Sequence, residues 1–498
     1  METAGPRILE IAAGASPADP LPLFVGGRWE AAASGATLDT REPATGKVLA
    51  RVADGGAEDL ARAVARGREA AAAWASIPPA ERGEAIAALG ARLRDAAAEF
   101  GALDARDTGS PVAAMTADAI KGAKAMARAA GLATELKGET VPATAGRLHY
   151  STLEPWGVVG RITAFNHPIL FSAARLAPAL VAGNAVILKP SELAPLAPLA
   201  LAELAADLLP EGLLSVLVGG PALGQAMARD PELRRLSFTG SPGTALAIQG
   251  GAAESGVIKT MTFELGGKNP IVVFGDADLD AAAGAVVRGM NFTRVQGQSC
   301  GSTSRAFLHS DVREAVMERV LDAVGRIRLG DPLDPETEMG ALIDDRAVQR
   351  CRRFVDDAVA GGGRVLAGGA APTDPDLQDG SFFLPTVLDR VDHDSPLAQQ
   401  EVFGPVLSVF EWTDPAEALR LANDVRFGLT ASVWTCDLDA AFSMASQLEA
   451  GFIWVNDVEL RYGGVPFGGW KDSGTGLEDG LEELLSFTRA RFVNVRFG

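Results

Sequence analysis

The sequence predicts an α/β protein built from two α/β units. From Val158 onward, short apolar or β-branched runs alternate with segments of helical spacing, and this alternation starts again after Cys300. Such alternation is typical of βαβ units with parallel strands. The chain has 498 residues, of which 47% are hydrophobic, and this is enough for two or three domains with apolar cores.

A helical region precedes the first unit. Residues 57–130 are rich in Ala, Arg and Glu at helical spacing, which predicts amphipathic surface helices. Six short runs after them predict buried strands, with helices between the strands. The runs are VVGRIT, AVILK, LSVLV, RLSFT, VIKTMTFE and IVVF, between residues 158 and 274.

The second unit follows Cys300. Strands are expected at SRAFLH, RVLAG, LSVFEW, ASVWT and GFIWVN, and helices at VREAVMERVLDAVGRI, VQRCRRFVDDAVAGGG, PAEALRLAND and DAAFSMASQLEA. The last segment, RARFVNVRFG, predicts a strand that no later segment covers. An uncovered strand edge favours pairing with another chain.

Composition argues against several classes of protein. A formal net charge of −19 repels phosphate backbones, so we expect no nucleic-acid partner. Three cysteines are too few for a disulfide framework and suit a reducing compartment. Four histidines, with no CxxC or HxxxH spacing, predict no metal site.

One stretch imitates a membrane span. Residues 169–188 are strongly apolar, but Arg175, Pro178, Gly183 and Asn184 interrupt them. A buried helix, a Gly-Asn turn and a buried strand account for this stretch better. The first sixteen residues make a poor signal peptide, because a glutamate breaks their short apolar segment. We therefore expect a soluble, cytoplasmic protein with no membrane partner.

Cys300 has an unusual setting. The loop QGQSCGSTSR surrounds it with glycines and small polar residues, whereas a free cysteine is usually a buried apolar filler. This setting favours a nucleophile, although an inert loop thiol is an alternative on these residues alone. Cys351 and Cys436 lie in helix-like and strand-end contexts and are expected to be structural.

The loop FTGSPGTA is a candidate phosphate-binding turn. It joins a strand to a helix, and its glycines, hydroxyl groups and helix N-terminus suit a dinucleotide. An ordinary strand-to-helix turn with a Ser or Thr cap is the alternative. The other glycine-rich stretch, SGTGLEDG, has one residue too many for GxGxxG and is more simply a turn that caps a helix.

The stretch ILKPSE is a second candidate contact for a dinucleotide. Lys189 and Glu192 follow a buried strand, and open α/β sheets bind ligands beyond the carboxyl ends of their strands. The carboxylate of Glu192 can accept hydrogen bonds from both ribose hydroxyls and would repel a 2′-phosphate, which favours NAD over NADP. A charge pair that closes the loop explains the same two residues.

Nine segments in order resemble the aldehyde dehydrogenase superfamily over nearly the whole chain, in its NAD(P)-dependent, hydrolytic, cysteine-nucleophile type. The pairing of FELGGKNP with GQSC at this separation is highly specific. The segments are PWGVVGRITAFNHP, GNAVILKPSE, SFTGSPGTA, MTFELGGKNP, GQSCGSTSR, GDPLDPETEMGALI, EVFGPVLSV, GFIWVN and PFGGWKDSG.

The resemblance implies catalytic roles. Cys300 would be the nucleophile, Asn166 the oxyanion donor and Glu264 the general base, so that an aldehyde is oxidised through a thiohemiacetal and a thioester. Glu264 also favours water over coenzyme A as the acceptor of the acyl group. Gly297 and Gly301 would leave room for a carbonyl group and a nicotinamide beside Cys300.

The resemblance also implies a cofactor site for NAD, with NADP as a secondary cofactor. Glu401 and Phe403 would hold the nicotinamide riboside. The residues expected to contact the cofactor are Thr163, Phe165, Lys189, Ser191, Glu192, Gly240, Ser241, Thr244, Leu265, Gly266, Glu401 and Phe403.

The expected substrate mouth departs from the family pattern. Arg294 stands where aromatic residues are frequent, and Glu459 and Arg461 lie in a stretch that often lines the aldehyde tunnel. A polar or anionic tail of the aldehyde would pair with Arg294 or Arg461. Pairing of Arg461 with Glu459, or with a neighbouring subunit, is the alternative. The expected substrate contacts are His167, Phe171, Arg294, Ser299, Gly301, Glu459, Arg461 and Phe467.

The family fold implies a Rossmann-like cofactor domain, an α/β catalytic domain and a small β oligomerisation element. We expect the NAD-binding domain at 1–137 and 156–267, with 473–484 packing back on it, and the catalytic domain at 268–472. Residues 138–155 and 485–498 would make a homodimer or homotetramer through a hairpin near TAGRLHYSTLEPW and the C-terminal strand.

Two other functions are compatible with parts of the sequence. A cysteine hydrolase would need a histidine partner for Cys300, and the sequence assigns none. A cofactor-binding structural protein without activity would have no need to keep Cys300, Glu264 and Asn166 together.

Overall fold

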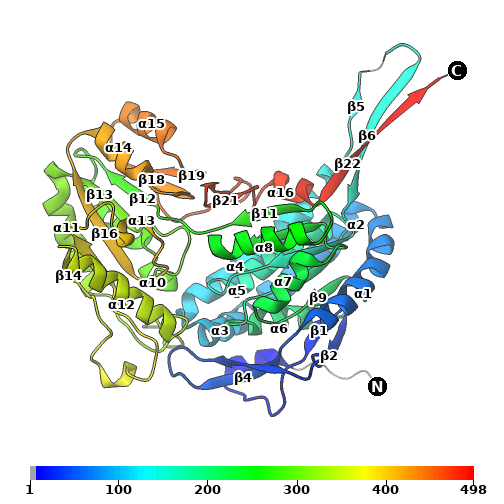
Figure 1. Cartoon of the computed structure of the whole chain (residues 1–498), viewed down its shortest axis with the longest axis horizontal. Helices are drawn as coiled ribbons and strands as arrows, with labels where there is room; N and C mark the ends of the chain where they lie inside the picture. The colour runs from blue at the N-terminus through cyan, green and yellow to red at the C-terminus, as the bar shows by residue number, and fades with distance from the viewer. Residues whose placement is uncertain (1–6, 143, 498) are drawn as a thin grey trace.

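The computed structural model describes residues 7–142 and 144–497, which form two lobes and a projecting β-arm (Figure 1). One lobe contains an eight-stranded sheet and the other a seven-stranded sheet. Residues 265–269 carry the chain from the last long strand of the first sheet, β11 (Thr260–Glu264), to β12 (Pro270–Val273) of the second. The predicted α/β class is confirmed.

The eight-stranded sheet has the order β2-β1-β9-β8-β7-β10-β11-β21, and β7 to β11 run parallel. Strand order reverses between β7 and β10, and an open α/β sheet binds ligands at such a switch point. The other strands in it are β1 (Leu23–Val25), β2 (Arg28–Glu30), β7 (Val158–Ile162), β8 (Ala185–Lys189), β9 (Leu214–Val216), β10 (Arg235–Thr239) and β21 (Gly474–Thr475).

Helices cover this sheet on both faces. Right-handed crossovers place α5 (Pro168–Val181) and α6 (Leu196–Ala205) on one face, and α7 (Pro221–Arg229) and α8 (Pro242–Glu254) on the other. The helices expected over 57–130 are present as α1 (Ala57–Ser76), α2 (Pro79–Asp95), α3 (Ala97–Thr108) and α4 (Val112–Gly131). Of these, α4 is not a simple surface helix, because it packs against α2, α3 and α5.

The seven-stranded sheet has the order β14-β15-β16-β13-β12-β18-β19, with only β14 antiparallel to its neighbour. Its other strands are β13 (Arg305–His309), β14 (Arg364–Ala367), β15 (Thr386–Asp389), β16 (Val406–Trp412), β18 (Thr430–Trp434) and β19 (Phe452–Val455). Its helices are α9 (Leu279–Gly289), α10 (Phe292–Val295), α11 (Ser310–Gly325), α12 (Asp345–Ala360), α13 (Pro396–Gln399), α14 (Pro415–Asn423) and α15 (Leu438–Gln447).

Short elements complete the chain. The sequence pattern did not predict the N-terminal strands, because their three to six residues carry too little periodicity. They include β3 (Thr37–Arg41) and β4 (Val48–Ala53), which pair as a hairpin. The remainder are β17 (Phe427–Gly428), β20 (Trp470–Lys471), α16 (Leu481–Ser486) and the 3₁₀ segments Ile8–Ala13, Leu132–Glu135 and Pro375–Leu377.

The projecting arm is a three-stranded sheet of order β22-β6-β5 (Figure 1). It consists of β5 (Thr140–Val141), β6 (Arg147–Pro155) and β22 (Thr488–Arg496), and the pairs run from Thr488 opposite Pro155 to Arg496 opposite Arg147. The hairpin and the terminal strand therefore lie where the sequence placed them, and β22 forms an outer edge.

The apolar stretch 169–188 is buried protein interior. It forms α5, a turn with Gly183 at φ +99°, and the start of β8, and all of these positions but Leu170 are buried. Among the residues described, none of the helices is both long and apolar enough to cross a membrane. The prediction of a buried helix, turn and strand is confirmed.

The side chain of Arg305 anchors the second sheet. It is fully buried, and it donates hydrogen bonds to the carbonyls of Lys268 (2.9 Å), Leu421 (3.0 Å) and Ala422 (2.7 Å). Burial lowers the pKa of this guanidinium to about 9. Because β13 begins at Arg305, the same contacts hold the strand that directly follows the Cys300 loop.

We predict that Arg305→Met lowers the free energy of unfolding by about 3–5 kcal/mol, because it leaves three buried carbonyls without donors. Urea unfolding followed by circular dichroism measures this change. Arg326→Met is the matched control, since its side chain is 77% exposed, and it should change stability by less than about 0.5 kcal/mol. Equal unfolding midpoints for the two variants would contradict the anchoring role.

Candidate active site

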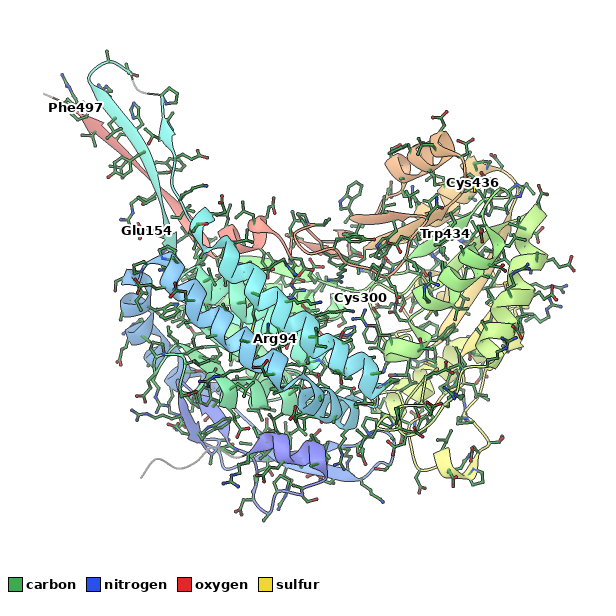
Figure 2. The ribbon with its side chains drawn as sticks, turned by 180° about the vertical axis from the view of Figure 1, so that it is seen from behind. Arg94, Glu154, Cys300, Trp434, Cys436 and Phe497 are labelled. Atoms are coloured by element: carbon green, nitrogen blue, oxygen red, sulfur yellow. The ribbon has the colours of Figure 1, made fainter. Side chains whose placement is uncertain are left out.

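Cys300 lies where two cavities meet between the lobes (Figure 2). A cavity of about 790 Å³ faces the switch point of the first sheet, and one of about 440 Å³ opens beside α4, α5 and the 459–463 segment. Cys300 and Phe171 line both. A molecule in either cavity can therefore reach the same sulfur atom, while the two cavities have different chemical linings.

The loop before Cys300 is held in an unusual backbone conformation. Gln296 and Gly297 both have positive φ, +53° and +69°, and Asn291 has φ +58°. Positive φ in non-glycine residues costs free energy and is concentrated at functional sites. A Cβ atom on Gly297 would lie 2.4 Å from the carbonyl oxygen of Gly404, so this glycine permits loop packing.

The sequence analysis expects Gly297 and Gly301 to leave room for a carbonyl group and a nicotinamide beside Cys300. For Gly297 this expectation is wrong. Its missing Cβ makes room for Gly404 and not for a reactant, whereas a Cβ on Gly301 would meet only Ser299 Oγ, at 3.8 Å. Gly267 lies directly against the backbone of Cys300. A Cβ atom on Gly267 would be 2.4 Å from the Cys300 carbonyl oxygen.

Asn269 fixes the position of Cys300. This buried side chain donates to the carbonyls of Cys300 (2.7 Å) and Ser302 (2.9 Å), and its Oδ1 accepts from the Thr430 N–H (3.0 Å). One amide thus ties together the starts of β12, β13 and β18. The sequence analysis missed this role, although Asn269 stands in the motif FELGGKNP.

The thiol of Cys300 is protonated at neutral pH. Burial raises its pKa to about 12, and the carboxylates of Glu401 and Glu264 add to the increase, while Arg461 opposes it. Activation of the thiol therefore needs a base or a bound cation close to the sulfur.

Asn166 lies in the larger cavity beside the nucleophile loop. Its Nδ2 donates to the Gln298 carbonyl at 2.8 Å, which orients the amide and leaves its second N–H available. The Cys300 N–H donates to no residue that the structure describes. These two free donors are the pair that an oxyanion on a carbon bound to Cys300 requires.

Glu264 ends β11 and lines the larger cavity with Cys300. Its side chain is buried, and neither carboxylate oxygen has a hydrogen-bond partner among the described residues. Burial and the nearby charge of Glu478 raise the pKa of Glu264 well above its usual range, while Arg175 and Arg461 act against this. An unpartnered carboxyl group of raised pKa suits proton transfer.

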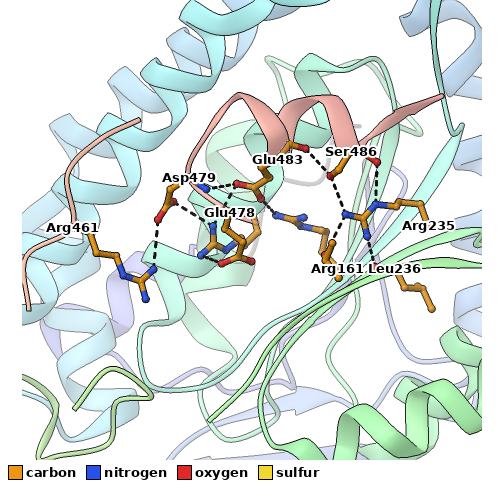
Figure 3. Close-up of polar contacts among 10 residues, drawn as sticks. Arg161, Arg235, Leu236, Arg461, Glu478, Asp479, Glu483 and Ser486 are labelled. Atoms are coloured by element: carbon orange, nitrogen blue, oxygen red, sulfur yellow. Dashed lines mark hydrogen bonds and ion pairs between the residues drawn. The ribbon is translucent and has the colours of Figure 1, made fainter. Parts of the chain in front are cut away.

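A largely buried ionic cluster, which includes Glu478, Asp479 and Glu483, contributes charges that act on Glu264 (Figure 3). Arg175 forms ion pairs with Glu478, with Asp479 (3.4 Å) and with Glu483 (3.6 Å), and Glu483 also pairs with Arg161 at 2.7 Å. Asp479 contacts Arg461 at 3.5 Å, so the cluster reaches from the interior to the smaller cavity. These residues come from β7, α5, the 459–463 segment, the residues just before α16 and α16 itself, and four of them, Glu478, Arg175, Arg461 and Asp479, act on the pKa of Glu264.

The larger cavity brings together every residue expected to contact a cofactor. It also contains Ile162 and Thr239, the last residues of β7 and β10, and therefore lies at the switch point. The expected residues on its wall are Thr163, Phe165, Lys189, Ser191, Glu192, Gly240, Ser241, Thr244, Leu265, Gly266, Glu401 and Phe403.

Two elements of this cavity suit the adenosine and phosphate parts of a dinucleotide. Ser241 caps α8 by accepting from the Thr244 N–H at 3.3 Å, so the turn is both a helix cap and part of the cavity wall. Lys189 and Glu192 form an ion pair at 3.6 Å, also on the wall. Thr163 Oγ1 is buried there with no partner among the described residues, which leaves it free for a ligand.

Glu401 and Phe403 close the cavity near Cys300. Glu401 accepts a hydrogen bond from the Gly267 N–H at 3.1 Å, and burial raises its pKa to about 7. The ring of Phe403, a residue with φ +53°, packs edge-on against Phe165 at 5.7 Å between ring centroids. The donor set and the shape of the cavity fit a nicotinamide dinucleotide.

The smaller cavity contains every residue expected to contact a substrate. Its apolar wall includes Trp454, which the sequence analysis did not single out. The expected residues on its wall are His167, Phe171, Arg294, Ser299, Gly301, Glu459, Arg461 and Phe467.

The pairing of its arginines differs from expectation. Arg461 does not pair with Glu459; it contacts Asp479 and lies over the Phe467 ring at 3.4 Å from the centroid. Arg294 donates to the buried Asp118 at 2.6 Å, and the same carboxylate contacts His167. Both arginines are therefore already neutralised by carboxylates within the chain.

The sequence analysis did not single out three cations on the wall of this cavity. Lys121, Lys124 and Arg128 project from α4 into it. The interpretation of 57–130 as surface helices hid them, although the i, i+3, i+7 spacing of these cations on one helix face was visible in the sequence.

The other two cysteines lie away from both cavities. Cys351 is buried in α12 and Cys436 is exposed after β18. Over the described ranges, no cluster of three or more His, Cys, Asp or Glu side chains has the arrangement of a metal site.

Known proteins match this chain over nearly its full length. The sequence profile of the aldehyde dehydrogenase family matches residues 29–493. A curated relative, aldehyde dehydrogenase tropH of Talaromyces stipitatus, is 41% identical over 483 residues, covering 96% of this chain and 93% of the relative.

Solved structures match as well. PnpE from Pseudomonas sp. WBC-3 superposes with a TM-score of 0.93 at 36% identity, covering 96% of this chain and 98% of PnpE, and a structure of PnpE with nicotinamide adenine dinucleotide matches equally. Betaine aldehyde dehydrogenase from Staphylococcus aureus in complex with NAD⁺ has a TM-score of 0.95 at 31% identity, covering 99% of this chain and 98% of that protein.

The protonated state of Cys300 predicts how its alkylation depends on pH. Because its pKa is raised to about 12, the thiolate fraction should rise roughly tenfold per pH unit from pH 7 to 9 without a plateau. Site-resolved mass spectrometry after brief iodoacetamide treatment of the ligand-free protein measures this rate, with exposed Cys436 as the accessibility control. A plateau for Cys300 below pH 8 would contradict the predicted protonation.

Proposed function

This chain belongs to the aldehyde dehydrogenase family, and from that we propose that it oxidises an aldehyde to a carboxylate with NAD as hydride acceptor, Cys300 as nucleophile and Glu264 as general base. The position of Cys300 on the shared wall of the two cavities carries the proposal. One cavity fits a dinucleotide and the other fits a small organic substrate, so the reacting carbon would lie at the sulfur between them.

The first step is addition of Cys300 to the aldehyde. The sulfur forms a bond to the carbonyl carbon, the thiol proton passes to Glu264, and the carbonyl oxygen becomes an oxyanion. The free N–H of Asn166 and the backbone N–H of Cys300 would donate to this oxyanion. The raised pKa of Cys300 keeps its sulfur protonated before the reaction, and the raised pKa of Glu264 makes its carboxylate a stronger proton acceptor. Both shifts support proton transfer from Cys300 to Glu264.

Collapse of the oxyanion expels a hydride from the same carbon and leaves a thioester on Cys300. Bound NAD would supply the acceptor for that hydride. The residues of the chain that would hold NAD are those of the larger cavity, with Glu192 at the adenosine ribose, Ser241 at the pyrophosphate, and Glu401 with Phe403 at the nicotinamide riboside. The carboxylate of Glu192 favours NAD, with NADP as a secondary cofactor.

Hydrolysis then releases the product. Glu264, after releasing to solvent the proton that it took from Cys300, would take a proton from a water molecule, the resulting hydroxide would attack the thioester carbon, and the carbon–sulfur bond would break. The departing sulfur would take up the proton held by Glu264, which returns the Cys300 thiol. The buried, unpartnered oxygens of Glu264 support this role, because they are free to accept from water. The substrate tail would extend into the smaller cavity, whose cations favour a polar or anionic group.

The proposed domains follow the two sheets. Residues 1–137 and 156–267 would bind NAD, with 473–484 packing back on them through the pairing of β21 with β11. Residues 268–472 would form the catalytic domain, and 138–155 with 485–498 the oligomerisation element. We propose a cytoplasmic homo-oligomer acting on a small-molecule aldehyde.

We predict that Cys300→Ala abolishes reduction of NAD by aldehydes, because Cys300 is the only thiol that lines either cavity among the described residues. Glu264→Gln should lower steady-state turnover by about 10²–10⁴-fold, since it removes the base for hydrolysis. Absorbance of reduced cofactor at 340 nm measures both, and Cys436→Ala is the control that should keep wild-type activity, because Cys436 is exposed and lines neither cavity.

The same assay separates the other functions. Ester hydrolysis without cofactor reduction would indicate a cysteine hydrolase, and cofactor binding without any turnover would indicate an inactive binding protein. Either result in the wild-type chain, with a full aldehyde panel, would overturn the proposed reaction.

The exposed arm predicts self-association. Phe492 on β22 is 68% exposed, and the outer edge of this strand has free backbone groups among the described residues. Sedimentation velocity should show a dimer or tetramer for the wild type and a smaller species for Phe492→Asp. Ile258→Asp is the control, because Ile258 is 90% exposed and lies outside the arm. A monomeric wild type would contradict oligomerisation through β22.

A further inference from the structure

The cations of α4 that line the smaller cavity have no partner. Lys121, Lys124 and Arg128 make no ion pair within the described part of the chain, whereas the other three cations on this wall, Arg175, Arg294 and Arg461, each contact a carboxylate. The unpaired charges therefore lie on one helix and not on the residues that the sequence had suggested.

The spacing of these cations places them on one face of α4. Positions i, i+3 and i+7 of a helix lie above one another, so the three charges form a row of about 10 Å. Like charges at i, i+3 and i, i+4 destabilise a helix. A bound anion would remove this repulsion.

Lys121 is the first cation of this row, and other charged groups surround it. The charges that act on it are those of Arg294, Asp118, Glu459 and Arg461, and burial together with Arg294 lowers the pKa of its ammonium. Once the arginines that pair with carboxylates are set aside, the wall has three cations that are unpaired among the described residues, Lys121, Lys124 and Arg128, and one further carboxylate, Glu459. In a chain of net charge −19, this cavity is a local positive site that attracts anions against the field of the whole protein.

The same cavity also has an apolar part. Phe171, Phe467 and Trp454 line it together with Cys300, and Phe467 and Trp454 belong to one apolar cluster against which Cys300 packs. A ligand that satisfies both parts has an uncharged segment beside the sulfur and an anionic group at its far end.

We propose that the substrate is an aldehyde carrying a carboxylate at the end of the chain remote from the carbonyl, and that Lys121, with Lys124 and Arg128 beside it, determines this specificity. This deepens the proposed function and rests on it. Arg294 and Arg461 shape the site through Asp118 and Asp479, and the carboxylate of the substrate binds the α4 row.

The test compares aldehydes matched in length. Succinate semialdehyde and butanal differ only in the terminal carboxylate, as do adipate semialdehyde and hexanal. The wild-type protein with NAD should show a higher kcat/KM for the carboxylate member of at least one pair. The KM of that substrate should rise with ionic strength, because salt screens the cationic row.

The variants locate the specificity. In Lys121→Met the ratio of kcat/KM between the charged and uncharged aldehydes should fall by about 10–100-fold, the usual effect of losing a charged hydrogen bond. Lys121→Arg should restore most of the ratio, and Lys124→Met should lower it less. Lys47→Met, an exposed lysine outside both cavities, should leave the ratio unchanged, and thermal melting should show that all variants fold.

Failure of this inference is distinct from failure of the proposed function. If no aldehyde is oxidised, the proposed function is wrong. If butanal and hexanal are oxidised as well as their charged partners, or if the ratio is unchanged in both Lys121→Met and Lys124→Met, carboxylate specificity from α4 is wrong while the oxidation stands.

Discussion

The active-site geometry of this protein depends on the side chain of Asn269. Its amide joins the starts of three parallel strands and holds the carbonyl groups of the nucleophile loop, so the loop that carries Cys300 is fixed by the second sheet. The preceding residues, 265–269, leave the end of β11 in the first sheet. Glu264 and Cys300, which are 36 positions apart, therefore belong to one site because the crossover between the sheets passes directly beside the thiol.

Burial determines the chemistry available at that crossover. Both the thiol and the carboxyl group have raised pKa values, mainly because each is withdrawn from water. The ionic cluster around Arg175 contributes to this environment, since Glu478 raises the pKa of Glu264 while Arg175 lowers it. The burial of these two groups therefore sets how readily each of them exchanges a proton.

The two cavities divide the work of recognition. The larger one lies at the topological switch point of an open sheet, where strand ends and a capped helix provide backbone donors and hydroxyl groups in a fixed geometry. The smaller one is lined by side chains of α4, α5 and a loop. The architecture of the sheet does not determine which charges these side chains carry. The cofactor site is thus a property of the fold, while the substrate site is a property of individual residues on it.

The sequence by itself determined the α/β class and most strands and helices, and it named residues that the fold brings to the walls of the two cavities, because short periodic runs and contiguous motifs such as FELGGKNP carry that information locally. It did not determine which charges pair. Arg461 contacts Asp479 and Arg294 contacts Asp118, partners that lie 18 and 176 positions away. The placement of Lys121, Lys124 and Arg128 was also decided only by tertiary structure, since cations on an alanine-rich helix are equally suited to open solvent until the packing of α4 against α5 brings them to the wall of the smaller cavity. Local pattern specifies elements and motifs; the partners of a charged side chain depend on long-range packing that one sequence does not encode in any short segment.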